Sequence, residues 1–296
     1  MSSHAAETPS RPAAPKARDR QLVQRPDVLF RRCVTGVVIA LALLWLVPVA
    51  WALDTSLKAE PDTIKIPVSW AIPHLTLSAY SLDFSATDIG RWYINSAIVA
   101  VIVTVLTVFT ASMAGYALSR QRFRGKPLVY AAILAGIMIP PQALMVPLFR
   151  EFQSVHLINT YWALILPQVP APIAVFIFKK FFDGQPIELD QAARVDGASW
   201  WTCYRRIGLP LARSAVSAVA IFTFVWTWNN FLWPFLSATN QNMMTIPVGL
   251  GTVISGTGII NALQMASAVL GALPLVMVFL LGQRQIVEGV AGTGLK

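Results

Sequence analysis

A polar segment between two apolar stretches carries the charged and small side chains best placed to do chemistry. Residues 188–198 read Glu-Leu-Asp-Gln-Ala-Ala-Arg-Val-Asp-Gly-Ala, and residues 207–210 read Ile-Gly-Leu-Pro. The segment is too polar to enter lipid, and its pattern is typical of a helix rather than of a passive connection. We therefore predict that this segment docks onto another protein.

Local signals begin a short helix in this segment. Pro186 suits the first turn of a helix, and the charges of Glu188 and Asp190 favour its positively polarised end. Four residues at helical spacing would share one face, on which two alanines let another backbone come close. These residues are Leu189, Ala192, Ala193 and Asp196.

A second short helix is expected after a break. The pair Asp196-Gly197 ends the first helix and can cap the next, which would run through Trp200 and Trp201 to a stop near Pro210. Two helices at an angle would result. The alternative is an amphipathic hairpin on the membrane surface, which the Trp and Arg residues would also suit.

A second set of residues could hydrogen-bond a solute. They lie late in one apolar stretch and early in the next: Thr227, Trp228, Asn229, Asn230 and Gln264. Amides can pair with sugar hydroxyls, and an aromatic ring can cover the apolar face of a sugar. The alternatives are an interfacial tryptophan belt and polar contacts that join helices.

Signatures of an enzyme are absent from the sequence. There is no G-x-x-x-x-G-K-[ST] loop, no G-x-G-x-x-G after a strand, no H-E-x-x-H and no G-x-S-x-G. The three histidines are scattered, and Cys33 and Cys203 have no clustered His beside them. We predict no catalytic residue, no metal site and no cofactor in this chain.

Composition places these segments in a membrane protein. The 296 residues are 55% hydrophobic and 12% charged, against about a quarter charged in soluble proteins. A bilayer core needs about twenty apolar residues per helix, which predicts an all-α polytopic chain with six spans. The spans are expected at residues 33–53, 95–118, 129–149, 161–178, 211–235 and 263–282.

These spans define the expected organisation. Residues 1–32 would form a disordered basic cytoplasmic arm, residues 33–284 the membrane domain with a polar loop at 183–210, and residues 285–296 a cytoplasmic tail. Prolines should interrupt the third and fourth spans, either at the path of a solute or in plain kinked packing: Pro140, Pro141, Pro147, Pro167, Pro170 and Pro172. No charged residue lies in the cores of the spans, which argues against proton or sodium coupling within this chain.

The distribution of Lys and Arg predicts the orientation. If both termini are cytoplasmic, 19 of the 23 basic residues lie on the cytoplasmic side. The net charge of +9 is therefore a topology signal, and no loop is large enough to form a basic face for nucleic acid. Of the two longer outside connections, residues 54–91 look like an ordinary surface loop. The other, residues 237–262, has no charge and many Gly, Thr, Asn and Ser residues, so it is either a flexible connection or a functional loop.

The docking segment resembles a known motif. Residues 191–198, with Ile207 and Leu209-Pro210 downstream, are similar to E-A-A-x-x-D-G-A…I-x-L-P of ABC importer permeases. The layout from Arg32 onward also resembles MalG-type subunits of carbohydrate importers. The matching positions are Ser56-Leu57-Lys58, Asn95-Ser96, Trp228-Asn229-Asn230-Phe231 and Gln283-Arg284-Gln285-Ile286-Val287.

The resemblance implies a type I importer permease fold in a bacterial cell membrane, with a coupling helix docked on an ATPase. The residues it implies for coupling are Glu188, Gln191, Ala192, Ala193, Asp196, Gly197 and Ala198. It further implies a heterodimer with a second permease, two ATP-binding subunits that hold ATP and Mg, and an extracytoplasmic solute-binding protein. Membrane lipid surrounds such a chain, and nucleic acid is not a partner.

The resemblance also implies a direction of transport. This chain would form half of the path for a sugar, while the uncharged loop would reach the binding protein and residues 289–296 would follow the ATPase dimer. The loop residues implied are Thr245, Gly249, Gly251 and Gly256. The alternatives are import of a glycerophosphate-type solute or other polyol, and a receptor or structural subunit that transports nothing.

One position departs from the motif. The leading Glu of the family is Gln191 here. In the resemblance that Glu pairs with an Arg of the ATPase, whereas a neutral amide offers hydrogen bonds without the charge-assisted part of the contact. We expect Gln191 to lie in the ATPase cleft all the same.

Overall fold

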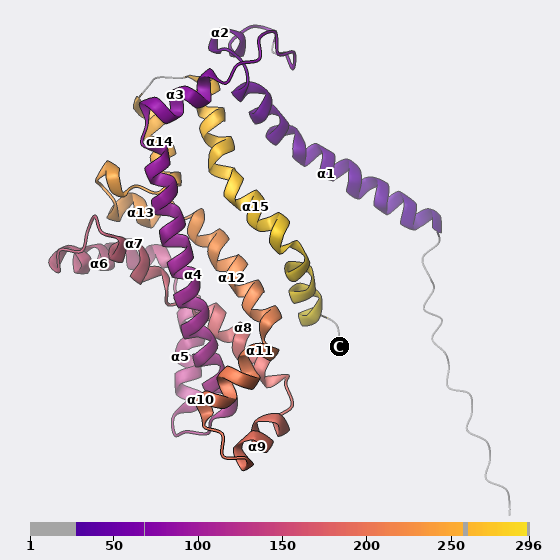
Figure 1. The fold of residues 1–296 in the computed structure, drawn as a ribbon, viewed down its shortest axis with the longest axis vertical. Coiled ribbons are helices and arrows are strands. Elements are labelled where there is room, and N and C mark those ends of the chain that lie inside the picture. Colours follow the sequence, from indigo (N-terminus) through magenta and orange to yellow (C-terminus); the bar gives the residue numbers. More distant parts are fainter. Residues whose placement is uncertain (1–27, 68, 257–259, 295–296) are drawn as a thin grey trace, which may run out of the picture. The chain divides into compact units, whose positions relative to one another are not determined.

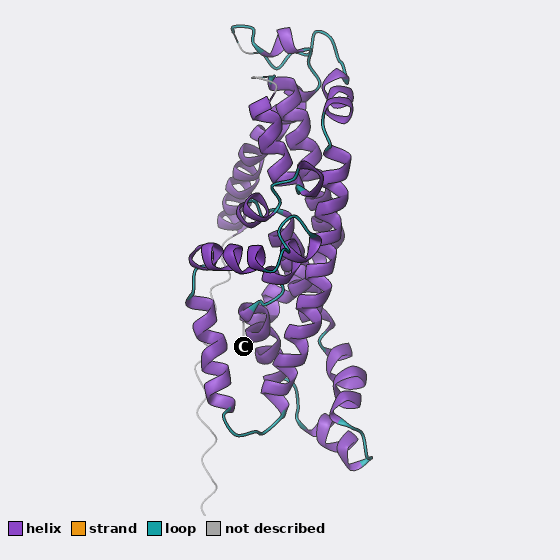
Figure 2. Ribbon diagram, turned by 90° about the vertical axis from the view of Figure 1, so that its left-hand side faces the viewer, coloured by secondary structure: helices purple, strands orange, loops and turns teal. Residues whose placement is uncertain are grey.

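The computed structural model describes residues 28–67, 69–256 and 260–294, and these form helices and loops without a strand (Figures 1 and 2). The chain divides into two units, residues 1–48 and 49–296. The longer helices are α1 (Val28–Ser56), α3 (Ser78–Ala86), α4 (Ile89–Arg120), α5 (Lys126–Met138), α6 (Pro141–Ser154), α8 (Pro172–Asp183), α9 (Glu188–Val195), α12 (Arg213–Trp228), α14 (Ile246–Gly256) and α15 (Asn261–Gly294). The shorter ones are α2 (Glu60–Thr63), α7 (Tyr161–Ile165), η1 (Leu166–Gln168), α10 (Trp200–Cys203), the π-helical turn η2 (Tyr204–Gly208), α11 (Leu209–Leu211), α13 (Leu232–Ser237) and η3 (Gln241–Met243).

Three helices are long and apolar enough to cross a membrane alone. They cover Phe30–Ser56, Ile89–Arg120 and Asn261–Gln283. Three further pairs satisfy the same criteria only together, which allows up to six spans among the described residues. The all-α polytopic fold is thus as predicted. Of the predicted arm, residues 1–27 lie outside the described residues, and where a separate tail was expected after residue 284, α15 continues to Gly294.

The third and fourth expected spans are not straight helices. α5 and α6 meet at 98°, and the α7–η1 segment meets α8 at 45°. The breaks fall where prolines were expected to interrupt helix, because Pro140 lacks the N–H that a continuing helix needs and α8 begins at Pro172. Pro147 is an exception, since it lies inside α6.

The fifth expected span, residues 211–235, is also broken. α12 ends at Trp228, and α13 begins again at Leu232. The side chain of Trp233 donates a hydrogen bond to the Ala163 carbonyl at 2.8 Å, which holds α13 against α7 rather than in line with α12. Pro234 also opposes a continuous helix here, because it has no N–H for the Asn230 carbonyl four residues earlier.

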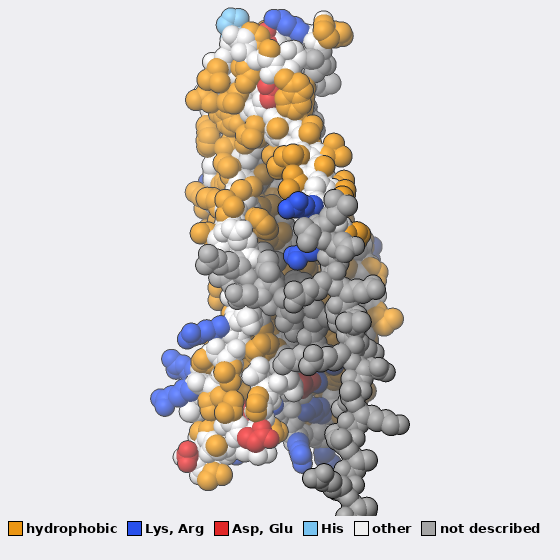
Figure 3. All heavy atoms as spheres, turned by 90° about the vertical axis from the view of Figure 1, so that its right-hand side faces the viewer, with side chains coloured by type: hydrophobic (Ala, Val, Ile, Leu, Met, Phe, Trp, Pro, Cys, Tyr) orange, Lys and Arg blue, Asp and Glu red, His pale blue; other side chains and the backbone are white. Residues whose placement is uncertain are grey.

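Helix α4 is central to the second unit, because α8 and α12 both pack against it. Its close approach to α8 depends on Gly115, at which a Cβ atom would lie 2.6 Å from Cβ of Phe178. Phe178 and Phe182 are fully buried beside it. On the face drawn in Figure 3, Lys and Arg side chains gather mostly toward the lower end, where α9 and α10 lie in Figure 1.

The uncharged connection after α13, for which a flexible connection and a functional loop were both considered, contains secondary structure. It contains η3 and the helix α14, although residues 257–259 lie outside the described part. Asn95 of α4 donates from Nδ2 to the carbonyls of Asn242 and Met244 at 2.9 and 2.8 Å, and Ser96 Oγ accepts from the N–H of Ile246 at 2.8 Å. We call residues 241–246 the outer strap, because these bonds fasten them to α4.

The outside connection 54–91 is also more ordered than a surface loop. Glu60 accepts hydrogen bonds from the first two N–H groups of α15, each at 2.9 Å, so that its negative charge caps that helix. Asp83 is fully buried and accepts a hydrogen bond from Ser267 of α15 at 2.7 Å. Burial raises the pKa of Asp83, although hydrogen bonds from Ser267 and Thr87 oppose that shift.

Candidate docking segment and cavity

The docking segment folds as the two short helices expected. Glu188 and Asp190 lie in the first turn of α9 and Arg194 in its last, which complements the helix dipole. Gly197 has φ +83°, a left-handed conformation that glycine adopts without strain. The break between α9 and α10 is therefore confirmed.

The second helix of the segment runs slightly further than expected. α10 continues through η2 and α11 to Leu211, and the chain then turns by 77° into α12. Arg194 lies over the Trp200 ring at 4.5 Å, a cation–π contact that holds the two short helices together. Both side chains are exposed, so the contact contributes about 0.5–1 kcal/mol to this arrangement.

The residues expected to dock on a partner differ in how exposed they are. Ala193 is partly buried against the hydrophobic core beneath the segment, as is Ala198. Gln191, Ala192 and Asp196 are exposed. The exposed apolar side chains are Leu189 and Val195, at 44% and 87% exposure. The exposed face of α9 therefore presents polar groups flanked by two aliphatic side chains, and of Ala192 and Ala193 only Ala192 is exposed.

Asp190 attaches the segment to the rest of the chain. Its carboxylate is 4% exposed and accepts a hydrogen bond from the Tyr116 hydroxyl at 2.5 Å. Nε of Arg120 lies 2.8 Å from the other carboxylate oxygen, an ion pair without aligned hydrogen-bond geometry. The sequence indicated a dipole role for Asp190. It did not indicate these partners, which lie some seventy residues earlier in α4.

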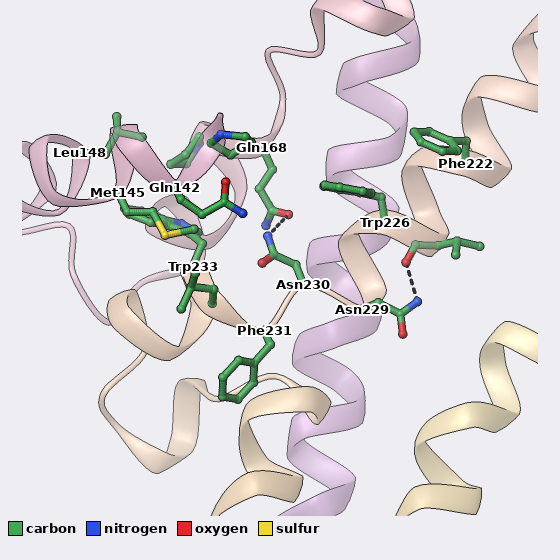
Figure 4. A pocket seen from close by; sticks show the side chains of 14 residues that line it. Gln142, Met145, Leu148, Gln168, Phe222, Trp226, Asn229, Asn230, Phe231 and Trp233 are labelled. Atoms are coloured by element: carbon green, nitrogen blue, oxygen red, sulfur yellow. Dashed lines mark hydrogen bonds between the residues drawn. The ribbon is translucent and has the colours of Figure 1, made fainter. Parts of the chain in front are cut away.

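A cavity of about 490 Å³ lies between α6, η1, α12 and α13. Four amide side chains line it, namely Gln142, Gln168, Asn229 and Asn230. Asn230 Nδ2 donates to Gln168 Oε1 at 2.8 Å, and the two side chains point toward each other in Figure 4. The remaining lining is apolar or aromatic and includes Trp226 and Trp233, without any charged residue.

The cavity contains two of the five predicted solute contacts. Asn229 and Asn230 line it, whereas Thr227 and Trp228 are buried outside it and Gln264 lies on α15. Trp228 instead donates from Nε1 to the Gly271 carbonyl at 3.2 Å, joining α12 to α15. For Trp228 the helix-packing interpretation fits the structure, and the roles of Thr227 and Gln264 stay predictions.

Sequence reasoning missed two amides of the cavity, Gln142 and Gln168. Each directly follows a proline, Pro141 and Pro167 respectively, within an apolar stretch. A polar amide beside a helix break at membrane depth was the signal that could have identified them.

The residues proposed for the binding-protein loop have different environments. Thr245 is 4% exposed, and Gly249 is buried where a Cβ atom would overlap the Trp92 ring. Gly251 is partly exposed and Gly256 is the last residue of α14. Thr245 and Gly249 are therefore buried within this chain, Gly249 directly against Trp92, and a contact of this loop with the binding protein stays a prediction.

Comparison with known proteins identifies similar chains. The family described as binding-protein-dependent transport system inner membrane component matches residues 107–291. The arabinooligosaccharides transport system permease protein AraQ of Bacillus subtilis is 32% identical over 90% of this chain and 96% of its own. The trehalose/maltose transport system permease protein MalG of Thermococcus litoralis is 32% identical over 92% and 99%.

Two further comparisons agree with these. The diacetylchitobiose uptake system permease protein NgcG of Streptomyces coelicolor is 33% identical over 85% of this chain and 86% of its own. A chain in the crystal structure of a bacterial ABC transporter involved in the import of the acidic polysaccharide alginate matches with a TM-score of 0.79. It is 18% identical over 88% of this chain and 97% of that one, so this likeness concerns the fold.

Proposed function

This chain belongs to the binding-protein-dependent transport system inner membrane component family, and we propose that it forms half of the path of a sugar through a bacterial cell membrane. Chains of this family are permease subunits of ABC importers, which work with ATP-binding and substrate-binding partners and are not themselves enzymes. ATP hydrolysis belongs to a separate subunit.

One observation carries the choice of a sugar. The cavity is lined by amides and aromatic rings and by no Asp, Glu, Lys or Arg, which suits a neutral, hydroxylated solute. Its volume of about 490 Å³ is within the usual range for small-ligand sites. The names of AraQ, MalG and NgcG, which refer to transport of oligosaccharides, support the same class. A phosphate ester would lack a cationic partner in this lining.

The proposed assembly contains this chain, a second permease as heterodimer partner, two ATP-binding subunits that hold ATP and Mg, and an extracytoplasmic binding protein. Both termini lie in the cytoplasm, as the distribution of basic residues favours. The coupling contact with the ATPase is proposed for the exposed part of α9 and the turn after it, with Glu188, Gln191, Ala192, Asp196 and Gly197 outermost and Ala193 and Ala198 behind them.

The test is ATP hydrolysis by the purified four-chain complex in lipid vesicles. We expect stimulation by binding protein loaded with an arabino-oligosaccharide, maltose or diacetylchitobiose, and none by glycerol 3-phosphate. Stimulation by glycerol 3-phosphate alone would transfer the proposal to a phosphorylated polyol. With a competent ATPase present, no stimulation by any solute would support a subunit that transports nothing.

A further inference from the structure

The coupling helix is attached through a carboxylate rather than through an apolar face. Among the residues of α9, Asp190 is the one that is fully buried. Of the large apolar side chains of α9, Val195 points into solvent at 87% exposure and Leu189 is 44% exposed. Apolar packing of α9 is therefore limited mainly to Ala193 and part of Leu189, and the contacts of Asp190 are its fully buried attachment.

Asp190 contacts two residues of α4 that lie one helical turn apart. The Tyr116 hydroxyl donates to Oδ1 at 2.5 Å, and Arg120 Nε lies 2.8 Å from Oδ2. Arg120 also donates from a terminal guanidinium nitrogen to the Gln185 carbonyl at 3.1 Å, just before α9 begins. Since residues four apart share one helix face, both contacts come from the same side of the inner end of α4.

The surroundings of this cluster leave it no freedom to shift. The Tyr116 ring packs edge-on against Phe182 at 5.2 Å and at a tilt against Tyr204 at 5.5 Å. A Cβ atom at Gly208 would lie 2.9 Å from the Tyr116 ring, so η2 approaches it as closely as glycine allows. A buried ion pair adds little net stability, but breaking it leaves a buried charge without a partner. The geometry of the cluster is defined by the hydrogen bonds beside the pair, from the Tyr116 hydroxyl to Asp190 and from Arg120 to the Gln185 carbonyl.

Resting on the function proposed above, we propose that Asp190, Arg120 and Tyr116 form a positioning latch that makes α9 and α4 move as one body. The 32 residues of α4 extend about 48 Å. Near its other end, Asn95 holds the outer strap through two hydrogen bonds, and Trp92 Nε1 donates to Gln241 at 3.1 Å. A displacement of α9 by the ATPase thus reaches the outer strap through a single helix.

The first test measures coupling. Asp190→Asn preserves shape and removes the charge, and Arg120→Gln removes its partner. In the four-chain complex each is expected to lower transport per ATP hydrolysed about tenfold, within the usual range of coupling between sites. The double variant is expected to be no worse than either single one, because the same interaction is lost. Additive losses would overturn the latch.

The matched control is Lys179→Gln. Lys179 forms a more exposed ion pair with Asp183 at 2.6 Å, and both residues lie in α8, so this pair joins no two elements. Breaking it is expected to change transport per ATP by less than about twofold, as for other exposed pairs. A tenfold loss in this control would show that any nearby charge change impairs coupling, and the specific role of Asp190 would be lost.

The second test does not depend on transport. Amide hydrogen exchange of residues 187–196 in the complex is expected to become about tenfold faster in Asp190→Asn and Arg120→Gln, because local opening becomes easier, and to stay unchanged in Lys179→Gln. Unchanged exchange in the first two, or faster exchange with full coupling, would overturn the proposal. A wild-type complex that no sugar stimulates would instead contradict the proposed function and leave this exchange result valid.

Tyr116→Phe covers the case in which Asp190→Asn does not assemble. It removes one hydroxyl and keeps both ring contacts, so the expected loss of coupling is smaller, about fivefold. Normal coupling and normal exchange in Tyr116→Phe, together with failed assembly of Asp190→Asn, would reduce Asp190 to a folding role and overturn the latch.

Discussion

Two neighbouring residues of α9 have different environments. Asp190 is buried against Arg120, whereas Gln191 is exposed. The sequence placed both at a helix start, but it could not tell which would be buried, because that depends on side chains of α4. The inward residue fixes the helix, and the outward residue is free to contact the ATPase.

Gln191→Glu is the first prediction at this scale. If the ATPase presents an Arg, as the resemblance implies, the added charge should strengthen the contact by about 1 kcal/mol, which lowers the apparent Kd of the ATPase subunits about fivefold. The measurement is a titration of the ATPase onto permease-containing nanodiscs at two salt concentrations. The gain should shrink in high salt, and Gln191→Met serves as the uncharged control. An unchanged Kd would mean that no cation faces this position.

The turn after α9 gives the second prediction. No atom lies within 4 Å of a Cβ built on Gly197, so the constraint is its φ of +83° and not space. Gly197→Val should be strained by roughly 1–2 kcal/mol and lose much of its coupled transport, whereas Gly197→Asn, which tolerates that conformation, should retain most of it. Sugar uptake and co-purification with the ATPase are the measurements. Equal activity of the two variants would refute the conformational argument.

The cavity gives a third prediction. Asn230→Ala leaves Oε1 of Gln168 without its donor and removes an amide that lines the cavity, so KM for sugar should rise about tenfold with little change in kcat. Thr227→Ser is the control, because Thr227 is buried outside the cavity and should have a nearly normal KM. Should Thr227→Ser raise KM as strongly as Asn230→Ala, the path would have to run elsewhere.

At the scale of elements, the sequence predicted breaks that have a local cause. Pro140, Pro172 and Gly197 each end or begin a helix where their backbone chemistry requires it. We did not predict the break after Trp228, although Pro234 opposes a helix through Asn230, because the hydrogen bond of Trp233 to α7 involves a residue seventy positions earlier in the chain. Nor did we predict α14, since a sequence rich in Gly and Thr indicates a loop until Trp92 and Asn95 are placed beside it.

Gly249 tests that account of α14. A Cβ there would overlap the Trp92 ring, so Gly249→Ala should push α14 away from α4 and destabilise the chain by about 2 kcal/mol. Gly90→Ala, in the same helix as Trp92, has nothing within 4 Å of the added Cβ and should be neutral or slightly stabilising. Thermal unfolding in detergent distinguishes them. A Gly249→Ala variant as stable as the Gly90 control would mean that α14 packs elsewhere.

At the scale of the whole molecule, the coupling segment and the outer strap lie at opposite ends of one helix, α4. The coupling segment is fastened to the inner end of α4 and the outer strap to its other end. The cavity lies on helices that break beside it, α6, η1 and α12. This arrangement fits a transporter that opens alternately to each side only if the coupling segment faces the cytoplasm. The distribution of basic residues predicts that orientation, whereas the positions of the helices do not determine it.

The orientation is therefore the last prediction. With Cys33 replaced by Ser, the one remaining native thiol is Cys203, which is buried. A cysteine introduced by Ser85→Cys, exposed in α3, should react with a membrane-impermeant maleimide in intact cells, because this connection carries few basic residues. Arg124→Cys, between α4 and α5, should react only after the membrane is opened, since the arginines around it remain inside. If Arg124→Cys reacted in intact cells and Ser85→Cys did not, α9 would lie outside the cell, where no ATPase could reach it. That result would contradict the proposed function.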